Sequence, residues 1–314
     1  MKDIDVIVVG ELNVDLILNR IGFFPEMGKE TTAQQMTLTL GSSSAIFASN
    51  LSSLGAKVSF AGKIGNDNFG DVVLNSLLEK GVDVSLIQQS TNLATGITVV
   101  LNFDEDRSMV TYPGAMNDFS FKEIPLENLK RAKHLHFSSY FLQERLKKDV
   151  GKLLRFAKES GLTTSLDTQW DPAEKWDLDL ASVLPYVDVF LPNEKEIFKL
   201  TRKNTLSEAL KTLEGNANTV VVKMGNKGSV SWYKGNLEHR KSFLNTNVVD
   251  AIGAGDSINA GFIYKFIRGY SLCDCQEFGN LIGAISTTQA GGTAAFINYE
   301  KIMNIAEEKF GYIA

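Results

Sequence analysis

A glycine-rich turn near the C-terminal end of the chain carries the clearest chemical signal. Gly253, Ala254 and Gly255 are followed directly by Asp256 and then by a segment whose apolar residues have mostly helical spacing. The first N–H groups of a helix have no intrahelical partner and lie at the positive end of its dipole, so such a turn suits an anion. A carboxylate at the same point would repel a resting phosphate, and its chemical use is to take a proton from a nucleophile that attacks one. On the turn alone, an ordinary capping role for Asp256 is an equal alternative.

A second polar group follows the first apolar run. Residues 5–10 are almost continuously apolar and end at a glycine, which is typical of a strand buried on both faces of a parallel sheet. Asn13 and Asp15 come shortly after it, one residue apart, so their side chains point the same way towards the edge where α/β sheets bind ligands. A turn is an equal alternative for this aspartate.

Composition narrows the class of protein. The chain has 314 residues, 44% of them hydrophobic, a net charge of −5 and no basic run, which argues against a nucleic-acid or membrane-surface partner. No apolar stretch is long enough to span a membrane and the N-terminus lacks a signal-peptide pattern. Cys273 and Cys275 are too close for a normal disulfide, so we expect reduced thiols and a cytoplasmic protein.

The elements that must position these residues alternate between strand and helix from residue 113 onward, which predicts βαβ units and a mostly parallel sheet. Two segments differ. Residues 20–40 are rich in threonine and partly alternating, and residues 96–113 have the pattern of a hairpin with an acidic turn at 104–106. We therefore expect an α/β domain of residues 1–19, 41–95 and 114–314, and a small β-sheet of residues 20–40 and 96–113. This sheet would act as a lid over the cleft or as the interface of a homodimer.

The order of these pieces resembles the ribokinase-like (PfkB) carbohydrate kinase family over essentially the whole chain. The matching features are Asn13-x-Asp15, the turn at Gly41 leading to Leu54-Gly55, Gly65-x-Asp67-x-Phe69-Gly70, Asn193-x-x-Glu196, Gly225-x-x-Gly228 and Asp250-x-x-Gly253-Ala-Gly-Asp256. The resemblance implies the ribokinase-like three-layer αβα fold, with a mostly parallel central sheet and a small β-sheet lid. It also implies ATP-dependent transfer of a phosphoryl group to a hydroxyl of a small molecule.

The roles of single residues follow from the same resemblance. Asp256 would be the catalytic base, and Gly253, Ala254 and Gly255 would form the anion hole that stabilises the transferred phosphoryl. The acceptor would bind Asn13, Asp15, Gly41, Ser42 and Ser43. The nucleotide would bind Asn193, Lys223, Gly225, Gly228 and Asn280, with Glu196 holding Mg²⁺ through water and Asp250 as a candidate ligand of a monovalent cation such as K⁺.

Departures from the family pattern bear on the acceptor. Ser42 and Ile46 stand where ribokinase-type members have a glycine and an asparagine that touch sugar hydroxyls, so ribose is disfavoured. Asp171 stands where family members that act on sugar acids have an arginine. A carboxylate at this position would repel an anionic acceptor. We therefore expect a neutral sugar or polyol.

Other functions have to be weighed against this one. A nucleoside kinase of the same family is the first alternative, because Ile46 would suit the face of a base. A dinucleotide-binding dehydrogenase is disfavoured, because no Gly-x-Gly-x-x-Gly follows the first strand. A sensor that has lost catalysis would be expected to lose Asp256 or the glycines first, and both are present.

Overall fold

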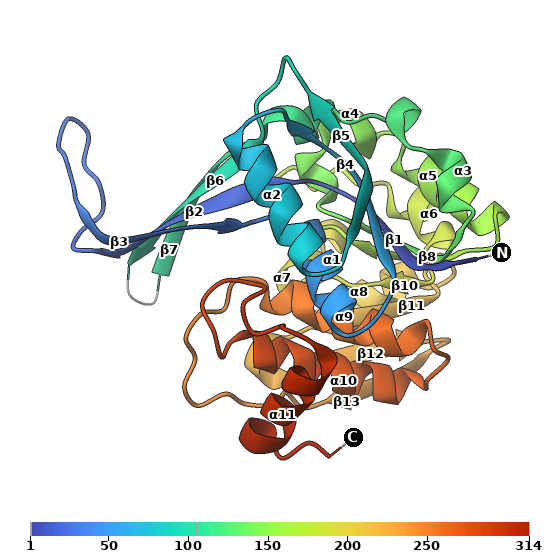
Figure 1. The fold of residues 1–314 in the computed structure, drawn as a ribbon. Helices are drawn as coiled ribbons and strands as arrows, with labels where there is room; N and C mark the ends of the chain where they lie inside the picture. Colours follow the sequence, from blue (N-terminus) through green and yellow to red (C-terminus); the bar gives the residue numbers. More distant parts are fainter. Residues whose placement is uncertain (1, 104–105, 314) are drawn as a thin grey trace.

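The computed structural model describes residues 2–103 and 106–313, and within these residues the chain forms two β-sheets with helices around the larger one (Figure 1). The larger sheet has nine strands in the order β13-β12-β11-β10-β9-β8-β1-β4-β5. Its pairs are parallel except for β11–β12 and β12–β13. Its strands are β1 (Ile4–Val9), β4 (Val58–Gly65), β5 (Asp83–Ser90), β8 (Ala132–Ser138), β9 (Thr163–Asp167), β10 (Val189–Phe190), β11 (Thr219–Lys223), β12 (Ser229–Tyr233) and β13 (Asn236–Arg240).

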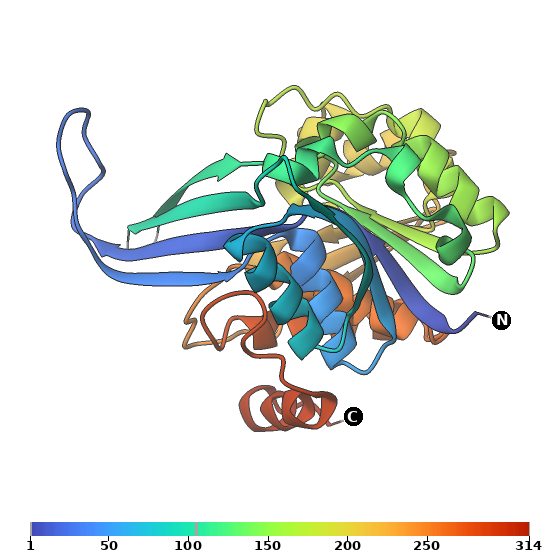
Figure 2. The ribbon, with the colours of Figure 1, turned by 45° about the horizontal axis from the view of Figure 1, so that its top comes forward.

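Strand β1 shows why this sheet is the middle of three layers. Ile7 and Val9 belong to one buried cluster and Val6 and Val8 to another, so alternate side chains enter cores on opposite faces of the sheet. Figure 2 shows helices on both faces. The predicted three-layer α/β architecture is confirmed. The helices are α1 (Ser43–Ser53), α2 (Asn68–Glu79), α3 (Leu126–Leu129), α4 (Glu144–Lys147), α5 (Val150–Glu159), α6 (Leu180–Val183), α7 (Glu194–Thr201), α8 (Leu206–Leu213), α9 (Ala254–Phe266), α10 (Leu272–Ser286) and α11 (Tyr299–Phe310).

The smaller sheet contains β3 (Ala33–Leu40), β2 (Asn13–Ile21), β6 (Gly96–Phe103) and β7 (Asp106–Tyr112), in that order. It extends away from the larger sheet (Figure 2). The boundary predicted at residue 20 falls inside β2, so this sheet begins at Asn13. The hairpin of β6 and β7 is present, and residues 104–105 of its predicted acidic turn lie outside the described residues.

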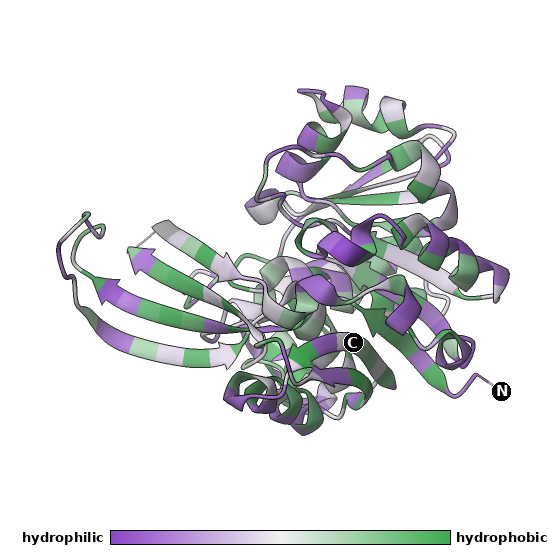
Figure 3. Cartoon of the chain, turned by 90° about the horizontal axis from the view of Figure 1, so that it is seen from above, coloured by the Kyte–Doolittle hydropathy of each residue, from purple (hydrophilic) through white to green (hydrophobic). Residues whose placement is uncertain are grey.

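The two faces of the smaller sheet differ in chemistry. One row of paired residues across all four strands is polar and contains Thr39, Asp15, Thr98 and Thr111. The next row, on the opposite face, is apolar and contains Leu38, Leu16, Val99 and Val110. Figure 3 shows hydrophobic and hydrophilic residues alternating along these strands. In the part of the chain that the structure describes, no helix combines the length and the apolar character needed to cross a membrane.

Candidate active site

The glycine-rich turn opens helix α9 as the sequence predicts. Gly253 is the N-cap of this helix, with a φ of 72°, and a Cβ atom added there would lie 2.7 Å from the Cα of Gly292. A side chain at this position would therefore be both strained and blocked. Ala254 and Gly255 begin the helix, so their N–H groups belong to the first turn, which favours an anion, and the N–H of Ala254 also donates to the carbonyl oxygen of Ala251 at 3.3 Å.

Asp256 lies in that first turn and is buried, with 7% of its surface exposed. Its Oδ1 accepts a hydrogen bond of 2.8 Å from the Nε2 of Gln169. Burial raises the pKa of Asp256 well above its usual value, and the nearby carboxylate of Asp167 raises it further, while the ammonium of Lys223 opposes both effects. A carboxylate with raised proton affinity at an anion-binding turn is suited to accept a proton from a hydroxyl.

Lys223, at the end of β11, brings a positive charge to the same place. Its Nζ lies 2.6 Å from Oδ2 of Asp167, in an ion pair that is almost completely buried. A Cβ atom added to Gly255 would lie 3.7 Å from the same Nζ, so the ammonium adjoins the anion-binding turn. Burial alone would lower the pKa of Lys223, but the Asp167 and Glu196 carboxylates outweigh it and the pKa is raised, so the side chain is charged.

The predicted acceptor residues meet at the start of β2, in the smaller sheet. The Nδ2 of Asn13 donates to Oγ1 of Thr98 at 2.9 Å and to Oδ1 of Asp15 at 3.3 Å. Gly41 must be glycine here, because an added Cβ would lie 2.2 Å from the same Asp15 oxygen. Asn13, Asp15 and Gly41 are thus brought together.

The two predicted serines behave differently. Ser42 is buried and caps α1: its Oγ accepts from the N–H of Ala45 and donates to the backbone oxygen of Glu11 at 2.6 Å. Ser43 is the first residue of α1 and is half-buried. Ser42 therefore has a structural role in this arrangement, and its N-cap position fixes the start of α1 beside Gly41.

Asn193 and Glu196 form a capping box at the start of α7. The backbone N–H of Asn193 donates to Oε2 of Glu196 at 2.9 Å, and the N–H of Glu196 donates to Oδ1 of Asn193 at the same distance. Burial and the Asp167 carboxylate raise the pKa of Glu196 to about 7, against the opposing effect of Lys223. Glu196 is therefore close to the Lys223 cluster, as a ligand of a phosphate-bound cation should be.

The predicted nucleotide residues lie further along the same sheet. Gly225 and Gly228 both have positive φ values, and a Cβ at Gly228 would lie 2.0 Å from the carbonyl oxygen of Arg240. The Nδ2 of Asn280, on α10, donates to the carbonyl oxygens of Arg240 and Lys241. Arg240 and Lys241 line a hollow of about 420 Å³ together with His239, Ser242, Phe243 and Glu277.

Asp250 holds two backbone segments together. Its Oδ1 accepts from the N–H of Ile252 at 2.9 Å and its Oδ2 from the N–H of Gly291 at 3.0 Å. With both oxygens engaged, a monovalent cation near Asp250 would depend mainly on backbone carbonyl oxygens.

Two residues used to predict the acceptor have other surroundings than expected. The carboxylate of Asp171 accepts N–H groups from Ala173, Lys175 and Trp176 at 2.7 to 2.9 Å, so it fixes its own loop. The expectation that Asp171 repels an anion from the acceptor pocket stays a prediction, and its loop hydrogen bonds are a second use of this carboxylate. The side chain of Ile46 is buried against Gly253 and Gly292, because Cβ atoms at either glycine would lie within about 3 Å of it.

Sequence reasoning left three polar residues of this region without a role: the buried Asp167 and Glu11, and the half-buried Gln169. Asp167, at the end of β9, accepts hydrogen bonds at its Oδ2 from Lys223, Asn259 and Gln169. Gln169 links this carboxylate to Asp256. Glu11 accepts from the hydroxyl of Ser139 at 2.7 Å and also contacts Ser44, and burial raises its pKa. The position of Asp167 at the carboxyl end of a parallel strand was the available signal.

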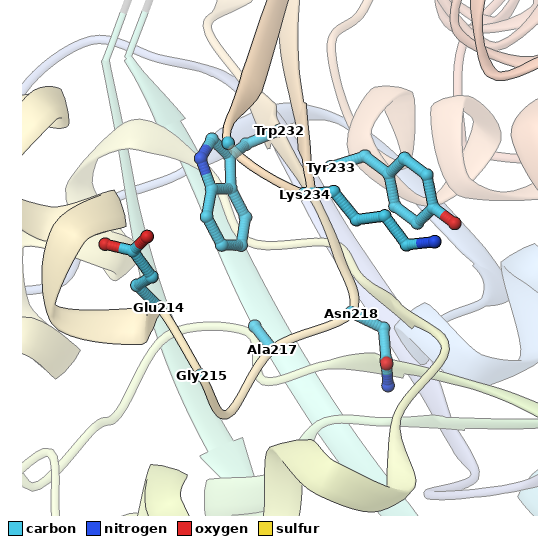
Figure 4. A pocket seen from close by; sticks show the side chains of 8 residues that line it. Glu214, Gly215, Ala217, Asn218, Trp232, Tyr233 and Lys234 are labelled. Carbon is cyan, nitrogen blue, oxygen red and sulfur yellow. The ribbon is translucent and has the colours of Figure 1, made fainter.

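A second hollow lies at the opposite end of β11 and is separate from this site. Figure 4 shows it between the end of α8 and the turn that joins β12 and β13, with Glu214, Asn218 and Trp232 among its residues. Lys223 ends β11, whereas Asn218 precedes its first residue. This hollow of about 270 Å³ therefore has no part in the chemistry of Asp256.

Comparison with known proteins identifies the family of the chain. Residues 3–298 match the model of the pfkB family carbohydrate kinases. The chain belongs to this family. Among relatives, it is 27% identical over 291 residues to a ribokinase of Lactococcus lactis, covering 90% of this chain and 91% of the relative. It is also 27% identical over 302 residues to a 5-dehydro-2-deoxygluconokinase of Geobacillus kaustophilus, covering 90% and 88%.

A solved structure extends the comparison to the fold. The ribokinase of Arabidopsis thaliana, determined with ribose and ATP, matches with a TM-score of 0.83 at 23% identity, and the match covers 96% of this chain and 98% of that one. The fold is thus ribokinase-like. As a PfkB family member, the chain is a carbohydrate kinase, and the relatives named above act on different acceptors.

Proposed function

We propose that this carbohydrate kinase transfers a phosphoryl group from ATP to a hydroxyl of a neutral sugar or polyol. The observation that carries the proposal is the buried Asp256 in the first turn of α9, close enough to the Lys223 ammonium for that charge to act on its pKa. In this proposal Asp256 is the proton acceptor, the start of α9 binds the transferred phosphoryl group, and Asp15 binds a hydroxyl of the acceptor.

Each of these groups has a task in phosphoryl transfer. Asp256 takes the proton of the acceptor hydroxyl as its oxygen attacks the γ-phosphorus. The bond from that phosphorus to the bridging oxygen breaks and ADP leaves. The N–H groups of Ala254 and Gly255 and the ammonium of Lys223 stabilise the charge on the transferred group. Little covalent chemistry is required of the protein, so positioning and this electrostatic field are sufficient.

The residues present also suit Mg²⁺ with ATP. Glu196 and the backbone around Asn193 supply oxygen ligands at the edge of the Lys223 cluster, and a magnesium ion held there through water would neutralise phosphate charge. In this proposal the nucleoside end of ATP lies in the hollow lined by Arg240 and Lys241, close to Gly228. A K⁺ ion near Asp250 is part of the proposal and would hold the loop that precedes Gly253.

Neutrality of the acceptor rests on Asp15 and its neighbours. The polar row that contains Asp15 is otherwise made of threonines, and Asn13 adds an amide. A carboxylate such as that of Asp15 accepts strong, charge-assisted hydrogen bonds from hydroxyl groups, and it repels an anion by a few kcal/mol at ~4 Å in a medium of intermediate dielectric constant. A nucleoside remains the second candidate. The side chain of Ile46, however, is packed against two glycines, so less of its apolar surface is accessible to the face of a base.

The test is a kinase assay with acceptors of both charge types. Fructose, ribose, inositol and adenosine are compared with 2-keto-3-deoxygluconate and fructose 1-phosphate at equal concentrations. A neutral sugar or polyol should give the highest kcat/KM. The highest value for either anion would overturn the neutral acceptor, and the highest value for adenosine would favour the nucleoside kinase.

The smaller sheet has two roles in this proposal. Its polar face carries Asp15 and closes over the acceptor as a lid, excluding water that would compete as nucleophile. Its opposite face exposes Val110 at 68% and Met36 at 68%, and a second copy of the chain covers this face to form a homodimer. The charged substitution Val110→Lys should then shift the molecular mass in solution from dimer to monomer.

A matched control lies on the same strand. Met109 is exposed to a similar extent, 59%, but its side chain points to the other face of β7. Met109→Lys should leave the molecular mass unchanged. A monomeric wild-type protein, or equal effects of the two substitutions, would contradict the dimer.

A further inference from the structure

Gln169 has an unusual backbone and an unusual set of partners. Its φ is 57°, in the left-handed region that residues with a side chain rarely adopt. Its Nε2 donates to Oδ1 of Asp256 at 2.8 Å and to Oδ2 of Asp167 at 3.1 Å. Its backbone N–H donates to the other oxygen of Asp167, also at 3.1 Å. One residue in a strained conformation thus connects two buried carboxylates.

Asp167 is a rigid anchor for this connection. It is completely buried, and its Oδ2 also accepts from Lys223 at 2.6 Å and from Asn259 at 2.5 Å. Three donors from three separate segments therefore fix one oxygen atom. The side chain of Gln169, which is bonded to that oxygen, therefore has a defined position, and so does the Asp256 carboxylate to which it also donates.

We propose that Gln169 is a positioning residue for Asp256, which holds Oδ1 of this carboxylate so that Oδ2 faces the acceptor hydroxyl. The inference deepens the proposed function and rests on it. An amide group suits this place because it donates to both carboxylates without adding charge. The left-handed backbone is the conformation that directs the side chain back to Asp256, which accounts for strain at this position.

The amide of Gln169 also opposes the electrostatic effects that disfavour the ionised form of Asp256. An N–H group donated to a carboxylate favours its ionised form. The charged groups that act on Asp256 come from four further elements of the structure: Asp167 from β9, Lys223 from β11, Glu196 from α7 and Glu11 from the segment after β1. All except Lys223 oppose ionisation, so a lost N–H donor should make the base harder to ionise.

Three substitutions separate the donor from the shape of the side chain. Gln169→Met keeps the length and removes the amide. Gln169→Glu keeps the shape and replaces the donor by a third carboxylate. Gln169→Asn keeps an amide and suits a left-handed backbone, but it is one methylene shorter and cannot span the two acids. Gln88→Met is the matched control: Gln88 is also half-buried, and its Nε2 donates to the carbonyl oxygen of Glu123, away from the site.

The measurements are kcat, KM for acceptor and nucleotide, and the pH dependence of kcat, made with the best acceptor of the kinase assay. For Gln169→Met we expect a loss in kcat of about 10- to 100-fold, as for a lost charge-assisted hydrogen bond, with both KM values within about threefold. The acid limb of the kcat profile should move up by roughly one pH unit. Gln169→Glu should move it further, and Gln169→Asn should resemble Gln169→Met. Gln88→Met should have the wild-type profile.

The outcomes distinguish this inference from the proposed function. If Gln169→Met and Gln169→Asn keep the wild-type kcat and acid limb while Asp256→Asn is inactive, Gln169 has no positioning role and the base stands. If Gln169→Asn is as active as wild type while Gln169→Met is not, the amide acts without reaching both acids, and the proposal is overturned. If Asp256→Asn also keeps wild-type activity, the site assignment itself fails.

Discussion

Asp15 and Asp256 are both buried carboxylates of the same candidate site, and they differ in the element that carries them. Asp15 lies on β2 of the smaller sheet, where it accepts from the amide of Asn13 at 3.3 Å and pairs with threonines in its row. Asp256 lies in the first turn of α9, near the charged groups of Asp167 and Lys223, and burial and the Asp167 carboxylate raise its pKa against the effect of Lys223. A carboxylate on the smaller sheet is suited to bind a hydroxyl of the acceptor, whereas a carboxylate with a raised pKa at an anion-binding turn is suited to proton transfer.

The largest effect expected from this comparison is on turnover. Asp256→Asn removes the base without changing the size of the side chain. We expect it to fold, to bind nucleotide as the wild type does, and to lose about 10²- to 10⁴-fold in kcat. Steady-state kinetics with saturating substrates measure the loss, and thermal shift with an ATP analogue checks folding and binding. A variant that retained more than half of the wild-type kcat would show that Asp256 is not the base.

A smaller effect, on binding, is expected at the other carboxylate. Gly41→Ala places a Cβ atom 2.2 Å from Oδ1 of Asp15, so the carboxylate must move. We expect KM for the acceptor to rise about tenfold, as for one displaced hydrogen bond to a charged group, while KM for the nucleotide stays the same. Gly22→Ala is the matched control, because an added Cβ there meets no atom within 4 Å. Equal kinetics for the two alanine variants would argue against Asp15 as an acceptor ligand.

How far the sequence predicts this molecule depends on whether a feature is local. The buried strands and the helix at Gly253 follow from residue types within one short segment, and the structure contains both. The start of the smaller sheet was placed too late, at residue 20. Asn13 and Asp15 alternate with apolar residues, which is the period of a half-buried strand, and we interpreted them as the end of the preceding strand.

The site shows the same limit at the level of side chains. The turn at Asp256 and the capping box at Asn193 could be predicted because their partners lie within four residues. Gln169 could not, because its contact with Asp256 spans 87 residues and depends on a left-handed backbone. The loop contacts of Asp171 were also missed, because the comparison with a family position drew attention to a ligand, whereas its carboxylate binds N–H groups of its own loop.

The smallest expected effect concerns stability on the charged side of the comparison. The pKa of Glu196 is raised to about 7 in the folded protein from an ordinary value of 4.5, because of burial and the Asp167 carboxylate. Between these two values the folded state holds a proton that the unfolded state has lost. The resulting stabilisation is complete below the lower value and disappears as the pH rises through 7, so the unliganded protein should be less stable at pH 8 than at pH 6 by roughly 1 kcal/mol from this group.

In Glu196→Gln the capping box can still form, because glutamine also serves at this position, but the titration is absent. The neutral buried histidines, His134 and His136, contribute equally in both proteins and cancel in the difference. Melting temperatures at pH 6 and pH 8 should therefore fall by about 2 °C more in the wild type than in the variant. The same pH dependence in both proteins would mean that Glu196 is ionised throughout this range, and that the charged side of the site holds one more negative charge before magnesium and nucleotide bind.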